Sequence, residues 1–184
     1  MLSPVHVLGP GERVGLWTQG CRKACPGCIS PEMQPHTGEE VPEELLARLL
    51  IQTAAAGGCT GLTVSGGDPL EQPGALLRLL ELVRPAFEDI LVYTGYRMDQ
   101  IRSGEAGRAA LQCLDLIDVL IDGPYTRERN FPDCALRGSD DQVIWYLDPG
   151  KRELYERYMG QGRALESFSH GDTVVIVGIL DREV

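Results

Sequence analysis

Short apolar runs alternate with longer amphipathic stretches along most of the chain. The runs at 61–65, 89–94 and 116–122 are rich in apolar residues and predict strands. The segments 42–58 and 73–87 carry leucines at helical spacing and predict amphipathic helices. The run at 116–122 is apolar almost throughout, which is typical of a strand buried on both faces of a parallel sheet. The alternation therefore predicts βαβ units and an α/β fold with a parallel sheet.

The remaining elements continue this pattern. Further short elements are expected in the order strand 5–8, strand 13–17, helical pieces 98–104 and 106–114, and late strands 142–147 and 172–179. A short helix is expected at 151–159, and the apolar and aromatic residues of the helical segment 151–168 are expected to face the core. With about five or six such units, the sheet is either open and doubly wound or a partial barrel. In both architectures the functional site lies at the carboxyl ends of the strands.

Composition narrows the class of protein. The chain has 184 residues, of which 43% are hydrophobic, and this fits one globular domain. Its net charge of −10 argues against a nucleic-acid-binding surface and against adhesion to anionic lipid. The N-terminus does not resemble a signal peptide, and the longest C-terminal apolar run is too short to span a bilayer. We therefore expect a cytoplasmic protein, in which clustered cysteines act as metal ligands or redox groups.

Three of the six cysteines form a cluster, Cys21, Cys25 and Cys28, with the spacing C-x3-C-x2-C. They could bind zinc with His36 as a fourth ligand, or Cys25 and Cys28 could form a redox dithiol. The third interpretation is a 4Fe-4S cluster held by three thiolates, which leaves one iron open to a substrate. Gly20 and Gly27 would let the loop wrap the cluster, and Arg22 and Lys23 would offset the thiolate charge. The other cysteines, Cys59, Cys113 and Cys134, are expected to be small buried residues.

A second motif, "SGGDP", follows the strand predicted at 61–65. It comprises Ser65, Gly66, Gly67, Asp68 and Pro69. It could be an ordinary strand-to-helix turn, because Gly, Asp and Pro dominate turns. Alternatively, the two glycines expose backbone carbonyls that could hold a ligand's ammonium group together with the Asp68 carboxylate.

The two motifs together resemble the radical S-adenosylmethionine (SAM) superfamily. In that superfamily the open iron binds the amino and carboxylate groups of SAM, and the glycine turn contacts its amino group. The ordered segments "GPGERVGLWTQGCRKACPGC", "LTVSGGDP", "VYTGY", "DVLIDGPY" and "LRGSDDQVI" are more specifically similar to activating enzymes of anaerobic ribonucleotide reductase. The candidate SAM-binding residues are then the 65–69 turn, Thr94, Gly95, Asp122 and Ile29. Of these, Ile29 would pack against the adenine ring. Asp122 could also be an ordinary strand-end residue.

The resemblance implies a shortened, open (βα) partial barrel of about five or six parallel strands with helices outside. One radical SAM domain would span 1–184, with a cluster loop at 19–40 and a C-terminal extension at about 148–184. A flavodoxin-like donor would supply an electron, SAM would be cleaved to a 5′-deoxyadenosyl radical, and that radical would take a hydrogen atom from a glycine of a partner enzyme.

The chain departs from the pattern of these activating enzymes at three positions. Ile29 and Ser30 stand where the family has an aromatic residue and Asn, and Asp141 stands where it has Asn. These departures leave open a second target, a small molecule or peptide of specialised metabolism. An alternative of another class is a non-catalytic zinc or iron–sulfur binding module.

Overall fold

A six-stranded sheet forms the centre of the computed structural model, which describes residues 1–180. Its strands lie in sequence order: β1 (Leu2–Val5), β2 (Arg13–Thr18), β3 (Gly61–Gly66), β4 (Asp89–Thr94), β5 (Val119–Asp122) and β6 (Val143–Tyr146). The four central strands are parallel, and β1 and β6 are antiparallel edge strands. The predicted open α/β sheet is confirmed, and its parallel part has four strands. The edge strands reverse direction because no crossover helix precedes β2 or β6.

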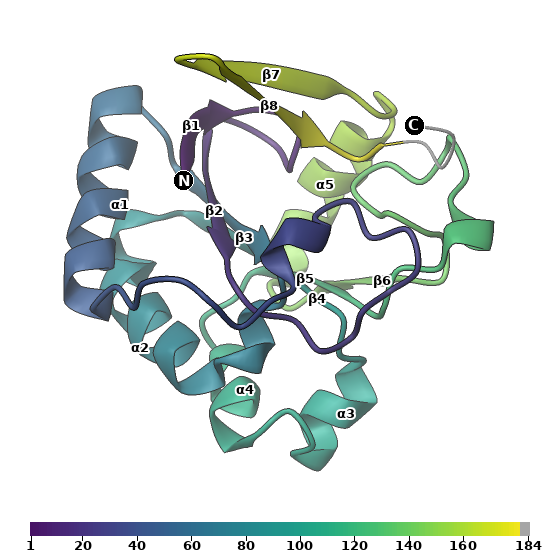
Figure 1. Cartoon of the computed structure of the whole chain (residues 1–184), viewed down its shortest axis with the longest axis horizontal. Coiled ribbons are helices and arrows are strands. Elements are labelled where there is room, and N and C mark those ends of the chain that lie inside the picture. Colours follow the sequence, from purple (N-terminus) through teal and green to yellow (C-terminus); the bar gives the residue numbers. More distant parts are fainter. Residues whose placement is uncertain (181–184) are drawn as a thin grey trace.

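Both faces of the sheet are covered, as the apolar strands predict (Figure 1). One face packs against four helices: α1 (Glu43–Gly57), α2 (Pro73–Val83), α3 (Met98–Ser103) and α4 (Arg108–Cys113). The other face packs against α5 (Arg152–Met159) through Leu91, Ile121 and Tyr155. No helix within residues 1–180 is long and apolar enough to cross a bilayer.

A separate hairpin, β7 (Leu165–His170) and β8 (Thr173–Gly178), lies over the N-terminal segment (Figure 1). Its Phe168 and Val177 pack against Val5 and Leu8. The expected helix through 168 is wrong beyond Met159, because the chain turns at residues 160–163 and continues as β7. The first strand also begins earlier than expected, at Leu2, and residues 7 and 8 join the hairpin cluster instead. The last four residues of the C-terminal extension lie outside the described residues.

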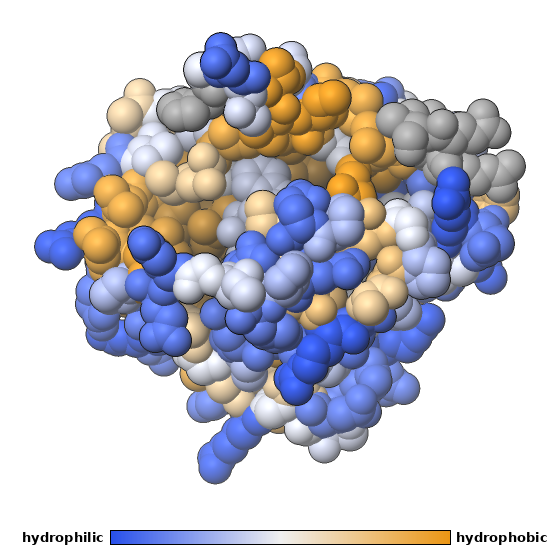
Figure 2. Space-filling view, viewed as in Figure 1, coloured by the Kyte–Doolittle hydropathy of each residue, from blue (hydrophilic) through white to orange (hydrophobic). Residues whose placement is uncertain are grey.

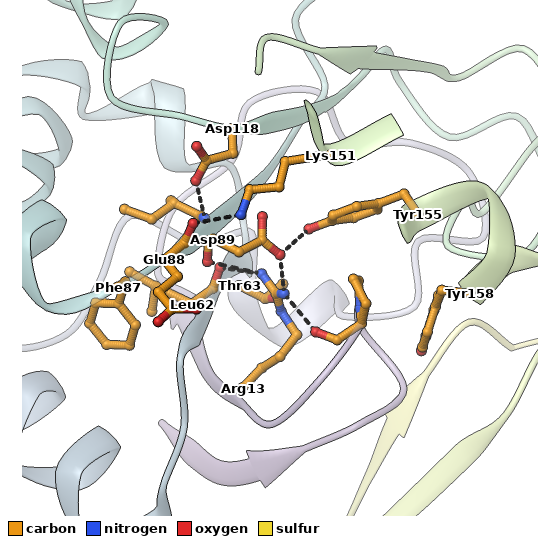
Figure 3. A network of polar contacts seen from close by, with 12 residues as sticks. Arg13, Leu62, Thr63, Phe87, Glu88, Asp89, Asp118, Lys151, Tyr155 and Tyr158 are labelled. Carbon is orange, nitrogen blue, oxygen red and sulfur yellow. Dashed lines mark hydrogen bonds and ion pairs between the residues drawn. The ribbon is translucent and has the colours of Figure 1, made fainter. Parts of the chain in front are cut away.

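A buried polar network fixes the amino-terminal ends of the central strands (Figure 3). The Arg13 side chain is fully buried, its Nη1 lies 2.5 Å from Asp89 Oδ2, and its Nε donates to Thr63 Oγ1 at 2.6 Å. The Tyr155 hydroxyl donates to the same Asp89 oxygen at 2.8 Å. The network ties β2, β3, β4 and α5 together at the sheet end opposite the site described next, so that end is rigid.

Candidate functional site

A cavity of about 1180 Å³ lies at the carboxyl ends of the parallel strands, where the fold predicts a site. Most of the predicted site residues line it: Cys21, Cys25, Cys28, Ile29, Ser65, Gly66, Gly67, Asp68, Thr94 and Gly95. The β7–β8 hairpin closes another side with apolar residues, and Figure 2 shows such residues gathered over the hairpin. The structure therefore brings the cysteine motif and the glycine turn into one cavity.

Backbone hydrogen bonds attach the cysteine loop to its surroundings. The Gly20 N–H donates to the Met33 carbonyl at 2.8 Å, and the Asp68 N–H donates to the Gly20 carbonyl at 2.9 Å. Gly20 has a left-handed φ of 104°, and a Cβ there would lie 2.7 Å from His36 Nδ1. His36 packs against the loop and is not among the residues that line the cavity.

The three clustered thiols lie in a common environment. All six cysteines are free, and burial raises the pKa of the Cys21 and Cys25 thiols. Hydrogen bonds from the backbone N–H groups of Lys23 and Ala24 oppose this effect and lower the pKa of Cys21. Cys25 is within electrostatic reach of both Cys21 and Cys28. Because a thiol binds metal as the thiolate, cluster loading would release protons from this loop.

The donor set fits an iron–sulfur cluster. Within residues 1–180, no group of three or more His, Cys, Asp or Glu side chains is arranged to hold a single metal ion. The three thiols instead border a cavity large enough for a multinuclear group and a neighbouring ligand. Thiolates on a cubane bind separate irons, so they surround a volume instead of meeting at one point. The cysteines suit a 4Fe-4S cluster by residue type and by their shared place on the wall of one cavity.

The glycine turn is shaped by contact with the cysteine loop. A Cβ at Gly67 would overlap the Gly20 carbonyl and lie 2.6 Å from the Met33 carbonyl oxygen. A Cβ at Gly66 would overlap the backbone of Thr18, and Gly66 has a left-handed φ of 116°. Glycine is therefore required at both positions for protein packing, whatever ligand the exposed backbone also binds.

Asp68 links the loops at the ends of β3 and β4. The residue is 1% exposed, and its carboxylate accepts hydrogen bonds from Leu70 N at 3.0 Å, Thr94 Oγ1 at 2.8 Å and Gly95 N at 2.9 Å. Burial raises its pKa, while these donors and the charge of Lys23 lower it. These three hydrogen bonds leave acceptor capacity on the carboxylate, and Asp68 lines the cavity, so its expected contact with an ammonium group stays a prediction.

The structure does not bring every predicted residue into the cavity. Asp122 is buried, accepts from Met98 N at 2.6 Å and Val143 N at 3.3 Å, and leaves the cavity wall to Gly123. Pro69 is buried at the start of a 3-10 turn outside the cavity lining. Asp141 accepts from Thr126 Oγ1 at 2.9 Å and shapes the loop between β5 and β6.

Several cavity residues were missed by sequence reasoning: Trp17, Tyr93, Tyr125, Asn130 and Gln142. Trp17 and Tyr93 could have been found, because they lie in predicted strands beside the motifs. Gln142 orders the β5–β6 loop by donating to the Gly123 carbonyl at 2.9 Å and accepting from Gly138 N at 2.8 Å. Asn130 sits in a loop and carries no local signal.

Comparison with known proteins identifies the class that this cavity defines. The family model of the 4Fe-4S single cluster domain matches residues 7–145, and the chain belongs to that family. The chain is also similar to curated proteins named anaerobic ribonucleoside-triphosphate reductase-activating protein. The relative from Escherichia coli K12 is 34% identical over 155 residues, which cover 78% of this chain and 95% of that protein. The relative from Enterobacteria phage T4 is 33% identical over 144 residues, which cover 76% of this chain and 86% of that protein. The relative from Haemophilus influenzae is 33% identical over 150 residues, which cover 77% of this chain and 92% of that protein.

Proposed function

We propose that this chain activates an anaerobic ribonucleotide reductase by radical SAM chemistry. The observation that carries the proposal is the joint placement of three free cysteines and the 65–68 turn around one cavity. The names of the similar proteins support the choice of partner. The names of the similar proteins also favour an activating enzyme over a non-catalytic binding module.

Different residues of the chain would hold the cluster, orient SAM and exclude water from the site. Cys21, Cys25 and Cys28 would hold the 4Fe-4S cluster, and the backbone of the 65–68 turn would bind the amino group of SAM. Ser65, Gly95 and Ile29 would form the remaining walls of the SAM site. The chemistry that the bound groups supply is one-electron cleavage of the sulfonium to a 5′-deoxyadenosyl radical, which takes a hydrogen atom from a partner glycine. Burial of Asp68 and Thr94 beneath that site keeps its floor fixed and dry.

The electron donor and the compartment belong to the same proposal. A flavodoxin-like protein would deliver the electron, and the cytosol would keep the thiols reduced. The hairpin wall offers exposed apolar residues, Val175 and Ile176, that a bound protein segment would bury, so it suits a protein segment as the hydrogen donor more than a charged metabolite.

The test is anaerobic reconstitution followed by reduction in the presence of SAM. We expect about four irons and four sulfides per chain and the formation of 5′-deoxyadenosine. The Cys28→Ala variant should lose both the cluster and the product, whereas Cys59→Ala, at a buried cysteine away from the cavity, should retain both. A fully loaded, reducible protein that forms no 5′-deoxyadenosine would refute the proposed chemistry. A stable glycyl radical on the reductase would identify the partner.

A further inference from the structure

The middle of the cysteine loop is held by two cationic side chains. Within residues 1–180, no backbone–backbone hydrogen bond joins residues 22–24 to another segment. Arg22 Nε instead lies 2.6 Å from Glu71 Oε2, and Lys23 Nζ lies 3.4 Å from the ring centre of Tyr96. The Tyr96 hydroxyl is 3.5 Å from Glu71 Oε1. These four side chains form a row of contacts, in the order Arg22, Glu71, Tyr96 and Lys23, between the cysteine loop and the segments after β3 and β4.

Of the two cations, Lys23 is the better placed to act on the site. The Arg22 side chain is 72% exposed, so solvent screens its ion pair. Lys23 is half-buried and lines the cavity with the three cysteines. Its Cγ lies 2.9 Å from the position a Cβ would take at Gly95, so the stem of the lysine fills the space above that glycine.

Lys23 reaches two groups of the site, one with its charge and the other with its backbone N–H. Its ammonium is within electrostatic reach of the buried Asp68 carboxylate, and its backbone N–H points to the Cys21 sulfur. A fixed positive charge beside a thiolate-bound cluster favours the more negative, reduced state. A cation stacked on an aromatic ring is also held in place better than a free lysine.

We infer that Lys23 is a positioning residue that fixes the cysteine loop against the segments after β3 and β4, and thereby sets the SAM affinity and reduction potential of the site. The fixing of the loop is independent of the proposed function, whereas the affinity and the potential rest on it. The chain has only one other lysine, Lys151, which lies outside the cavity and donates to the Glu88 carbonyl. Lys151→Met is therefore a matched control for Lys23→Met.

The first experiment is hydrogen exchange of the metal-free, reduced protein. In Lys23→Met we expect amides of residues 20–30 to exchange at least about fivefold faster, because local opening is no longer opposed by the Tyr96 contact. Lys151→Met should leave that segment unchanged, and Lys23→Arg, which keeps the charge and the stacking, should restore protection. Unchanged exchange in Lys23→Met would overturn the inference, whatever the protein does with SAM.

The second experiment uses the reconstituted protein. Lys23→Met should keep its full iron content, bind SAM about tenfold more weakly, and have a reduction equilibrium constant about tenfold lower, which is about 59 mV for one electron. A potential and an affinity equal to those of Lys151→Met would overturn the inference. If the wild-type protein holds a cluster but binds no SAM, the proposed function fails, and the exchange experiment still decides whether Lys23 fixes the loop.

Discussion

Replacing Gly67 by alanine tests whether the glycine turn and the cysteine loop form one packed unit. The φ of Gly67 is not left-handed, so the substitution adds a methyl group without backbone strain. That methyl would overlap the Gly20 carbonyl oxygen and lie 2.6 Å from the Met33 oxygen and 2.7 Å from the Gly20 carbon. Ordinary carbon contacts are about 3.5–4.0 Å, so the overlap is close to 1 Å at several backbone atoms. Backbone atoms cannot rotate away, and the loop itself must move.

The expected cost follows from this geometry. Overpacking of a rigid site costs about 1–3 kcal/mol, and we expect the upper end, about 3 kcal/mol, because every contacting atom belongs to the backbone. With a urea m-value of about 2 kcal/mol/M, the unfolding midpoint of the metal-free protein should fall by about 1.5 M. Iron content after reconstitution should fall as well, because the displaced loop carries the cysteines.

Gly74 provides the control for this measurement. It lies in the first turn of α2, and a Cβ there would meet no atom within 4 Å. Gly74→Ala should leave iron content unchanged and stabilise the protein by about 0.4–1 kcal/mol, because alanine restricts the unfolded chain. A Gly67→Ala protein that unfolds at the wild-type urea concentration and binds a full cluster would refute the packing argument.

Three further substitutions test individual contacts. Asp68→Asn replaces an acceptor oxygen by an amide, so Gly95 N or a neighbouring donor loses its partner; we expect destabilisation of about 1–3 kcal/mol by urea unfolding, and a loss within 0.5 kcal/mol of zero would contradict the bonding described. Tyr155→Phe leaves the buried Asp89 carboxylate with one donor fewer and should also cost about 1–3 kcal/mol, visible as a lower thermal midpoint; an unchanged midpoint would count against the network. Hydrogen bonds and nearby carboxylates raise the pKa of His6, so its stabilising contribution is present below a pH of about 6.5 and is lost as pH rises through the raised pKa. The difference in unfolding free energy between the wild type and His6→Gln should therefore shrink with rising pH, and a difference that grows would show the sign to be wrong.

The sequence does not predict toward which face of the sheet a residue at the end of a strand points. In β5, Val119 and Ile121 face α5, whereas Leu120 faces the helices on the opposite side. Both faces are buried and apolar, so the pattern of side chains does not reveal which face Asp122 shares. Asp122 has the parity of Leu120 and accepts a hydrogen bond from Met98 N of α3. Its partner in β4, Thr94, has the same parity and lines the cavity, so parity alone does not decide, and the contact of Asp122 with SAM stays a prediction. The cysteines escape this ambiguity because a loop can turn its side chains to one cavity without strand parity.

The first strand of the hairpin, β7, was not predicted from the sequence, whereas β8 agrees with the strand predicted at 172–179. The segment "LESFSH", residues 165–170, follows the mostly polar helix α5 and is itself mostly polar. Leu165 and Phe168 are its only large apolar residues. Its pairing with β8 is a short-range hairpin, in which His170 pairs with Thr173 across the turn residues Gly171 and Asp172, and this turn signal was overlooked. Strand preference depends on such neighbours more than helix preference does. The helix predicted from residue 151 was therefore continued too far, because only glycines mark its end in the sequence.

The spacing of the two motifs is a consequence of the sheet topology. β2 and β3 are adjacent parallel strands in register, with Thr18 opposite Gly66. The residues that leave these two strands therefore start side by side, and the bonds Gly67 N to Thr18 O, 2.8 Å, and Asp68 N to Gly20 O, 2.9 Å, continue the ladder beyond the strands. One βα unit is the shortest connection that returns the chain to this edge in the same direction. The cysteine loop has no regular structure of its own to position the thiols, and this extended ladder supplies that position. A change that breaks the ladder at the turn should thus impair metal binding by cysteines about 40 residues away in sequence, while changes of equal size elsewhere in the turn should not.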